Sequence, residues 1–135
     1  MAEAIAKKDS AEIIEASSAG LAPLGFVAGM TKATLTANGY ATHELDSKPI
    51  LREEWDAADI VINMSGRSRE HAFRNFAKVE DWEIEDPYGE DPEVYQRTFE
   101  DIRRHVGALT AKLQENRREP HPRRSPAKVS RRHDF

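Results

Sequence analysis

The segment ADIVINM, residues 58–64, decides the fold class of this chain. Residues 60–64 form a short, almost wholly apolar run, which is typical of a strand buried on both faces of a parallel β-sheet. Residues 13–16 predict a second short strand. Residues 79–84, in which two large apolar side chains alternate with acids, predict a third and weaker strand.

Helical patterns lie before, between and after these strands. The strongest begins with Asp91 as a plausible N-cap and Pro92 at the first helical position. Large apolar residues then recur at steps of three and four from Tyr95 to Leu113. This spacing would also fit a coiled coil, but packing on the sheet is favoured because the sheet needs a cover. The other predicted helices cover residues 2–9, residues 27–37 with a stop at Asn38-Gly39, residues 51–58, and a helix capped by Ser65 whose apolar face is Ala72, Phe73, Phe76 and Ala77.

Helices that alternate with strands predict a doubly wound α/β domain, a small parallel sheet with helices on both faces. The length of 135 residues, with 39% hydrophobic and 33% charged side chains, fits one small domain and a tail. No apolar run approaches the ~18 residues of a membrane span, and no signal-peptide pattern opens the chain. We therefore expect a cytoplasmic protein.

The last residues differ in composition from the rest. Residues 116–135 hold seven Lys or Arg and two acids, whereas residues 1–115 hold 13 basic and 22 acidic side chains. With three prolines and few large apolar groups, the tail is predicted to be disordered. We expect a domain at residues 1–116 and a basic disordered tail at residues 117–135. A solvated extension is favoured over a patch for nucleic acid or acidic lipid.

Four segments resemble the low-molecular-weight protein tyrosine phosphatases, in that family's order and spacing. They are MAEAIAKK (1–8), ASSAGLAPLG (16–25), ADIVINM (58–64) and VEDWEIEDPYGEDPEVYQRTFEDI (79–102). The resemblance covers residues 1 to about 113. It implies a four-stranded parallel sheet of order 2-1-3-4.

In that family a strand and a C-x5-R-S-P loop precede the segment that residues 1–5 resemble, and neither occurs here. The resemblance implies a chain cut just after its catalytic loop, in nature or by a start assigned too far downstream. The composition of residues 2–9 supports this expectation, because the predicted helix has no residue before it that could act as a side-chain N-cap. The chain also has no cysteine, which excludes disulfides and a cysteine nucleophile within these residues.

The resemblance implies roles for four residues. Asp86 occupies the general-acid position of the family, and Tyr88 would be one aromatic wall of a phosphotyrosine cleft. Leu24 and Phe26 would lie near the opposite wall. A substrate would be a phosphotyrosine protein or an aryl phosphate, if a catalytic loop were present, with no cofactor. The histidines lack the spacing of metal ligands, so no metal is expected.

Several of these segments also have a simpler, purely structural interpretation. Asp86-Pro87-Tyr88-Gly89 is a turn sequence in its own right. The acids between residues 80 and 93 would raise the pKa of Asp86 by like-charge repulsion, which suits a general acid. The same acids would equally fit a solvated loop. Residues 65–68 would fit a phosphate at a helix N-terminus, although simple helix capping is favoured.

The missing first strand would leave the strands at Ile13 and Ile60 without their common neighbour. They would pair directly, take a strand from another chain, or keep open edges that favour a homo-oligomer. We predict a phosphatase-family member without turnover as written. The alternative is a pseudophosphatase or interaction module that acts through its acidic face, an open sheet edge or the basic tail. The related arsenate reductases are disfavoured because their redox cycle needs several cysteines.

Overall fold

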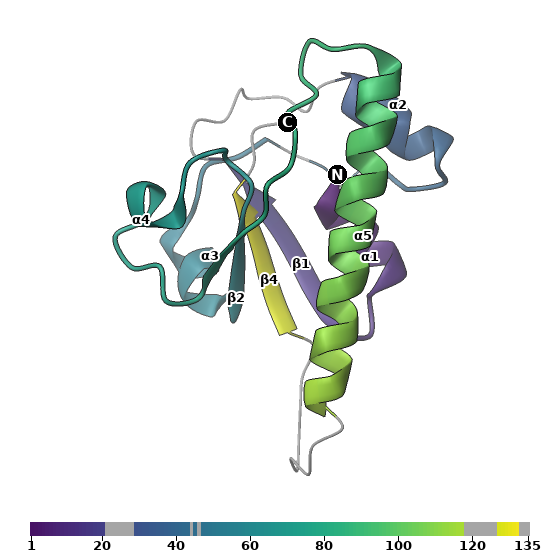
Figure 1. Cartoon of the computed structure of the whole chain (residues 1–135). Coiled ribbons are helices and arrows are strands. Elements are labelled where there is room, and N and C mark those ends of the chain that lie inside the picture. Colours follow the sequence, from purple (N-terminus) through teal and green to yellow (C-terminus); the bar gives the residue numbers. More distant parts are fainter. Residues whose placement is uncertain (21–28, 44, 46, 118–126, 133–135) are drawn as a thin grey trace.

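The fold is built on one four-stranded parallel sheet (Figure 1). The structure is a computed structural model, and it describes residues 1–20, 29–43, 45, 47–117 and 127–132. The strand order is β1-β4-β2-β3. The strands are β1 (Ile14–Ala19), β2 (Ile60–Asn63), β3 (Val79–Asp81) and β4 (Ala127–Arg132). The apolar segment at residues 60–63 is therefore a strand, as predicted, and three of its four residues are buried.

Helices cover both faces of the sheet, which confirms the doubly wound α/β prediction. Three of them, α1 (Ala2–Asp9), α2 (Gly29–Ala37) and α5 (Pro92–Arg117), lie together on one side in Figure 1. The short helices α3 (Arg52–Ala57) and α4 (Arg69–Ala72) lie on the other side. The larger core is the one beneath the first three helices.

Helix α5 owes its position to the apolar stripe seen in the sequence. Tyr95, Phe99 and Ile102 are each at most 2% exposed. The stripe packs against α1, α2 and residues of β1 and β2, so α5 is a cover for the sheet, as predicted. The main core consists of Met1, Ala2, Ala4, Ile5, Ala6, Ile14, Leu35, Tyr40, Ile62, Met64, Trp82, Tyr95, Phe99, Ile102, Val106 and Leu109.

The tail prediction is wrong for residues 127–132. These residues form β4, which lies between β1 and β2 and pairs in parallel with both. The neighbours β1 and β2 thus neither pair with each other nor leave an internal gap. Disorder was predicted from composition, but two flanking strands supply backbone hydrogen-bond partners that composition does not reveal. The other tail residues, 118–126 and 133–135, lie outside the described residues.

The helix predicted after Ser65 is also wrong in its extent. Only Arg69–Ala72 are helical, and Ser68 is the N-cap residue. The Ser65 hydroxyl donates a hydrogen bond to Asn63 Oδ1 at 2.7 Å, and its oxygen accepts the Arg67 N–H at 3.3 Å, so it holds a turn that precedes the helix. Phe73 leaves the helix and stacks on Trp55 of α3, with ring centroids 5.3 Å apart. This contact belongs to the smaller core on the second face of the sheet.

The remaining predicted elements are confirmed with shifted ends. The strand predicted at residues 79–84 ends at Asp81, although Trp82 is buried just beyond it. The helix predicted at residues 51–58 is α3, and its first predicted apolar residue, Leu51, is 47% exposed. Helix α1 has no side-chain cap, as its sequence indicates. None of the helices in the described ranges is long and apolar enough to cross a membrane.

Tyr40 gives the core a measurable pH dependence. Its hydroxyl donates a hydrogen bond to Asp9 Oδ2 at 2.6 Å, and its ring meets Phe99 edge-on. Burial, and then the bond to Asp9, raise the pKa of Tyr40 from 10.0 to about 12. A phenol with a raised pKa in the folded state stabilises the fold fully below its unfolded pKa, and this contribution is lost as pH rises through the folded pKa.

We therefore expect the free energy of unfolding to fall between pH 10.0 and about 12 through Tyr40. In the Tyr40→Phe variant this part of the decline should vanish, and stability at neutral pH should drop by about 1 kcal/mol. Urea unfolding of both proteins across this pH range measures the effect. Identical pH profiles for the two proteins would contradict the assignment.

Candidate functional site

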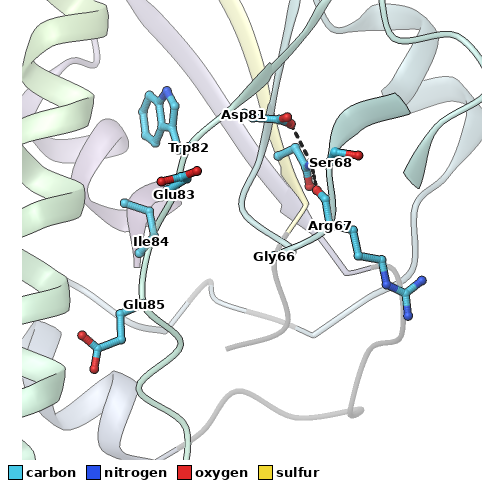
Figure 2. A pocket seen from close by; sticks show the side chains of 9 residues that line it. Gly66, Arg67, Ser68, Asp81, Trp82, Glu83, Ile84 and Glu85 are labelled. Carbon is cyan, nitrogen blue, oxygen red and sulfur yellow. Dashed lines mark hydrogen bonds between the residues drawn. The ribbon is translucent and has the colours of Figure 1, made fainter. Parts of the chain in front are cut away.

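A pocket of about 510 Å³ lies at the carboxyl ends of β2 and β3. Ligands of doubly wound proteins bind outside the carboxyl ends of the strands, so the position is that of a functional site. Figure 2 shows its two walls, the loop of Gly66, Arg67 and Ser68 and the segment from Trp82 to Glu85. The pocket is lined by Asn63, Gly66, Arg67, Ser68, Asp81, Trp82, Glu83, Ile84 and Glu85.

Asn63, the last residue of β2, organises the loop wall and is 2% exposed. Its Nδ2 donates to the carbonyl oxygen of Arg67 at 2.6 Å and to Asp81 Oδ1 at 2.8 Å. Its Oδ1 accepts from the Ser65 backbone N–H at 3.1 Å and from the Ser65 hydroxyl at 2.7 Å. A single buried amide thus holds the turn after β2 against the end of β3.

Asp81 completes the connection between the two strands. Its second carboxylate oxygen, Oδ2, accepts the backbone N–H of Arg69 at 3.2 Å. The Arg69 guanidinium in turn donates to the carbonyl oxygen of Val79 at 2.8 Å. Asp81 is therefore tied to the start of α4, which fixes the width of the pocket on this side.

Acidic side chains dominate the opposite wall. Glu83 and Glu85 both line the pocket and are exposed. Glu85 also accepts two hydrogen bonds of 3.1 Å from one nitrogen, Nη2, of Arg97 on α5. In Figure 2 the Arg67 side chain extends away from these acids. The wall from Trp82 to Glu85 therefore offers carboxylates and backbone groups. The loop wall offers a separate cation, the guanidinium of Arg67.

The turn that carries Asp86 and Tyr88 follows directly after Glu85. Asp86 Oδ1 accepts the backbone N–H of Tyr88 at 3.0 Å, and the Glu90 N–H donates to the Pro87 carbonyl at 2.9 Å. Gly89 has a φ of +80°, which an L side chain rarely adopts. The turn interpretation of Asp-Pro-Tyr-Gly is confirmed. The catalytic role of Asp86 stays a prediction.

This turn is anchored from below while its polar groups stay accessible. Pro87 is buried, whereas Asp86 is exposed and Tyr88 is 50% exposed. Tyr95 of α5 lies beneath with a backbone hydrogen bond from Gly89. Burial raises the pKa of Tyr95, and the bond from Gly89 offsets part of that rise. The anchored turn therefore carries an exposed acid, Asp86, and a half-exposed aromatic ring, Tyr88.

The other predicted site residues fall into two groups. Leu24 and Phe26 lie outside the described residues, so the wall that they would form opposite Tyr88 in a phosphotyrosine cleft stays a prediction. Among the described residues, no group of three or more His, Asp or Glu side chains could hold a metal ion. His105 packs against Trp82 with ring centroids 5.0 Å apart, and its Nδ1 lies 2.9 Å from the Asp101 carbonyl oxygen. His105 is thus a half-buried packing residue on α5.

Sequence reasoning missed the pocket itself. Its acidic wall was visible as a run of acids, and its loop wall as the segment Ser65 to Ser68. The two walls lie next to each other because β2 pairs with β3, which places Asn63 beside Asp81. The polar Asn63 at the end of an apolar strand was the one local sign of a site at this edge.

The parallel sheet, the helices on both faces and the pocket at the carboxyl edge define a small doubly wound α/β domain. The arginine phosphatase YwlE from Geobacillus stearothermophilus superposes with a TM-score of 0.78 at 22% identity, covering 91% of this chain and 89% of that one. An arsenate reductase in its reduced state superposes with a TM-score of 0.67 at 28% identity, covering 83% and 86%. A second reduced arsenate reductase gives a TM-score of 0.69 at 28% identity, covering 82% and 86%.

The family model of the low molecular weight phosphotyrosine protein phosphatases matches residues 1–119. This chain belongs to that family, which confirms the resemblance of the four segments. No curated protein sequence matches the chain.

Proposed function

We propose that this chain keeps the fold and the general-acid position of a phosphotyrosine phosphatase but has no turnover in its 135 residues. The observation that carries the proposal is the combination of family membership over residues 1–119 with a sequence that contains no cysteine. Covalent phosphoester hydrolysis in this family needs a thiolate that attacks phosphorus. One serine that lines the pocket, Ser68, lies beside a possible base, with its Oγ 2.8 Å from His71 Nδ1. Both side chains are exposed, and this pair is not proposed to replace the thiolate.

Asp86 is proposed to hold the position from which a carboxylic acid protonates a leaving phenolate. Its exposure and its place on an anchored turn support this assignment. General acid catalysis contributes about 10² to 10⁴ in rate and acts only when a nucleophile attacks. Tyr88, half exposed two residues further on, would face an aromatic substrate ring. The corresponding substrate class is a phosphotyrosine protein or an aryl phosphate.

The second candidate is a pseudophosphatase that binds a partner without hydrolysis, in the cytoplasm. The acidic wall of the pocket favours this candidate, because Glu83 and Glu85 present carboxylates beside a cavity of about 510 Å³. Such a surface attracts a partner rich in Lys or Arg, with a salt dependence that follows from screening. The observation behind this candidate is the negative charge at a concave site and not any catalytic group.

We expect the chain to hydrolyse p-nitrophenyl phosphate no faster than buffer does, and Asp86→Ala to leave that rate unchanged. Glu90→Ala, on the same turn, is the matched control. Turnover that Asp86→Ala abolishes and Glu90→Ala keeps would overturn the proposal. Calorimetric titration of the same protein with phosphotyrosine and with a lysine-rich peptide separates the two candidates.

A further inference from the structure

The second face of the sheet has only a thin cover, the short helices α3 and α4 (Figure 1). Neither helix has a buried residue, whereas α1 on the first face has five. The core beneath them consists of Ala58, Val61 and Val79, with Trp55 and Phe73 partly buried against it. Both faces of a parallel sheet are normally well covered. The two short helices instead leave apolar side chains in contact with water.

Four apolar side chains of this layer are at least partly exposed. Three large apolar residues are exposed in the part of the chain that the structure describes, and two of them, Leu51 and Phe76, flank α3 and α4. The Leu51 carbonyl accepts the Trp55 N–H at 3.0 Å, so the two side chains share one side of α3. Trp55 stacks on Phe73 with the ring planes at 24°. We call these four residues the apolar seam.

Charges of opposite sign lie on the two sides of the Trp55–Phe73 stack. Residues 51–59, which include α3, hold four acids and one arginine. Residues 67–78, which include α4, hold four Lys or Arg and one acid. Two of these cations touch the apolar seam, since Lys78 lies 5.0 Å from the Trp55 ring centroid and Arg69 lies 5.6 Å from that of Phe76. The α3–α4 face, defined as residues 51–59 and 67–78, thus has an acidic half and a basic half.

A surface with two such halves is complementary to itself. A two-fold axis through the Trp55–Phe73 stack exchanges the halves, so that the acidic half of one copy meets the basic half of the other. Asp56 follows Trp55 in sequence and Arg74 follows Phe73, and both side chains are exposed. The axis therefore sets Asp56 of each copy against Arg74 of the other. Two equal attractive contacts result, around a centre that removes apolar area from water.

We infer that the α3–α4 face binds the same face of a second copy of this chain and forms a two-fold symmetric dimer. This interface differs from the open sheet edges that the sequence suggested. The carbonyl of Val79 in the edge strand β3 already accepts the Arg69 guanidinium at 2.8 Å, which blocks part of that edge. The inference is independent of the proposed function, since it involves neither Asp86 nor the acidic wall of the pocket.

The apolar seam and the charges have different roles in this dimer. Large apolar side chains at the centre of an interface supply most of the affinity. The charges at its rim set the orientation, because a like-charge contact in any other arrangement repels. Exposed charges are screened by salt. The dimer should therefore dissociate more readily as the ionic strength rises, which an association through apolar contacts alone would not do.

The test uses the full chain and sedimentation velocity over a range of concentrations from low micromolar to near millimolar. The variants are Asp56→Lys, Arg74→Glu and an equimolar mixture of the two. Glu115→Lys and Lys112→Glu are the matched controls, because both residues are exposed on α5 and the substitutions change the net charge by the same amounts. Circular dichroism checks that each variant is folded, and amide chemical shifts followed on dilution locate the interface.

We expect the wild type to dimerise, and each charge reversal on the α3–α4 face to weaken the dimer by about tenfold or more, because two repulsive contacts replace two attractive ones. The mixture of Asp56→Lys with Arg74→Glu should recover an affinity within about threefold of the wild type, since each reversed charge then meets its opposite. The two controls should leave the dissociation constant within about twofold. Phe76→Ala should weaken the dimer by about tenfold in a folded chain.

Three results would overturn the inference. The first is a wild-type chain that stays monomeric at every concentration, which would leave this face to a different partner or to water. The second is a mixture of the two charge reversals that associates no more tightly than either variant alone. The third is a set of dilution-dependent amide shifts confined to β1 or β3, with none in residues 51–59 and 67–78, which would assign the dimer to a sheet edge.

Discussion

Replacing Phe99 by alanine is expected to lower the free energy of unfolding by about 3–5 kcal/mol, a large share of the 5–15 kcal/mol that holds a typical domain folded. Phe99 is fully buried in α5, and its ring meets Tyr40 with centroids 5.5 Å apart and planes at 63°. The substitution removes this contact and leaves a cavity at the junction of α5 with α2 and the sheet. The main core then loses its centre.

Urea unfolding followed by circular dichroism measures the loss. Phe76→Ala serves as the control, because Phe76 is 36% exposed and removal of a ring at the surface costs far less. A Phe99→Ala protein within about 1 kcal/mol of the wild type would mean that α5 is not anchored by this ring. Equal losses in the two variants would contradict the placement of the core.

Replacing Asn63 by aspartate is expected to cost about 3–5 kcal/mol, although the two side chains have the same shape. The change turns the Nδ2 donor into an acceptor, which would face the Arg67 carbonyl at 2.6 Å and Asp81 Oδ1 at 2.8 Å. Two carboxyl groups in contact repel when both are ionised, so the pKa of the introduced carboxyl rises. The loss should therefore be largest at neutral pH and should shrink as pH falls through this raised pKa.

Asn75→Asp is the matched control for this charge change. Asn75 is exposed, and its side-chain oxygen accepts the Ala77 N–H at 3.3 Å, a role that aspartate preserves. We expect Asn75→Asp to stay within about 0.5 kcal/mol of the wild type. Thermal unfolding of both variants at neutral and acidic pH makes the comparison. A stable Asn63→Asp protein would show that the loop wall of the pocket does not depend on this amide.

Local patterns were sufficient for most of the fold. The apolar run of β2 and the three-and-four spacing of α5 each encode a burial pattern in a single segment, so both were predictable. Strand β4 was not, because its sequence carries the charge of a solvated tail. Its place depends on pairing with β1, a partner from the opposite end of the chain. Helix α4 was overestimated because Ser65 forms a local turn, with bonds to Asn63 and to the Arg67 N–H, that sequence spacing does not distinguish from a helix cap.

The candidate site also has one part that the local sequence predicts and one part that it does not. The turn at Asp86 was predictable, because Asp, Pro and Gly each favour their observed backbone conformations over four consecutive residues. The pocket was not, since it exists only where residues 63 to 69 meet residues 81 to 85 across two paired strands. Site features that lie within one loop can be inferred from sequence. Features made by strand register require the fold.

The central position of β4 also orders the events of synthesis. Strands β1 and β4 are far apart in the sequence, so the sheet closes only after residues 127–132 have been translated. Pairing between segments this distant is expected to make the domain slow to fold for its size. Until β4 arrives, β1 and β2 lack the neighbour that separates them, and each exposes an unsatisfied strand edge to other proteins.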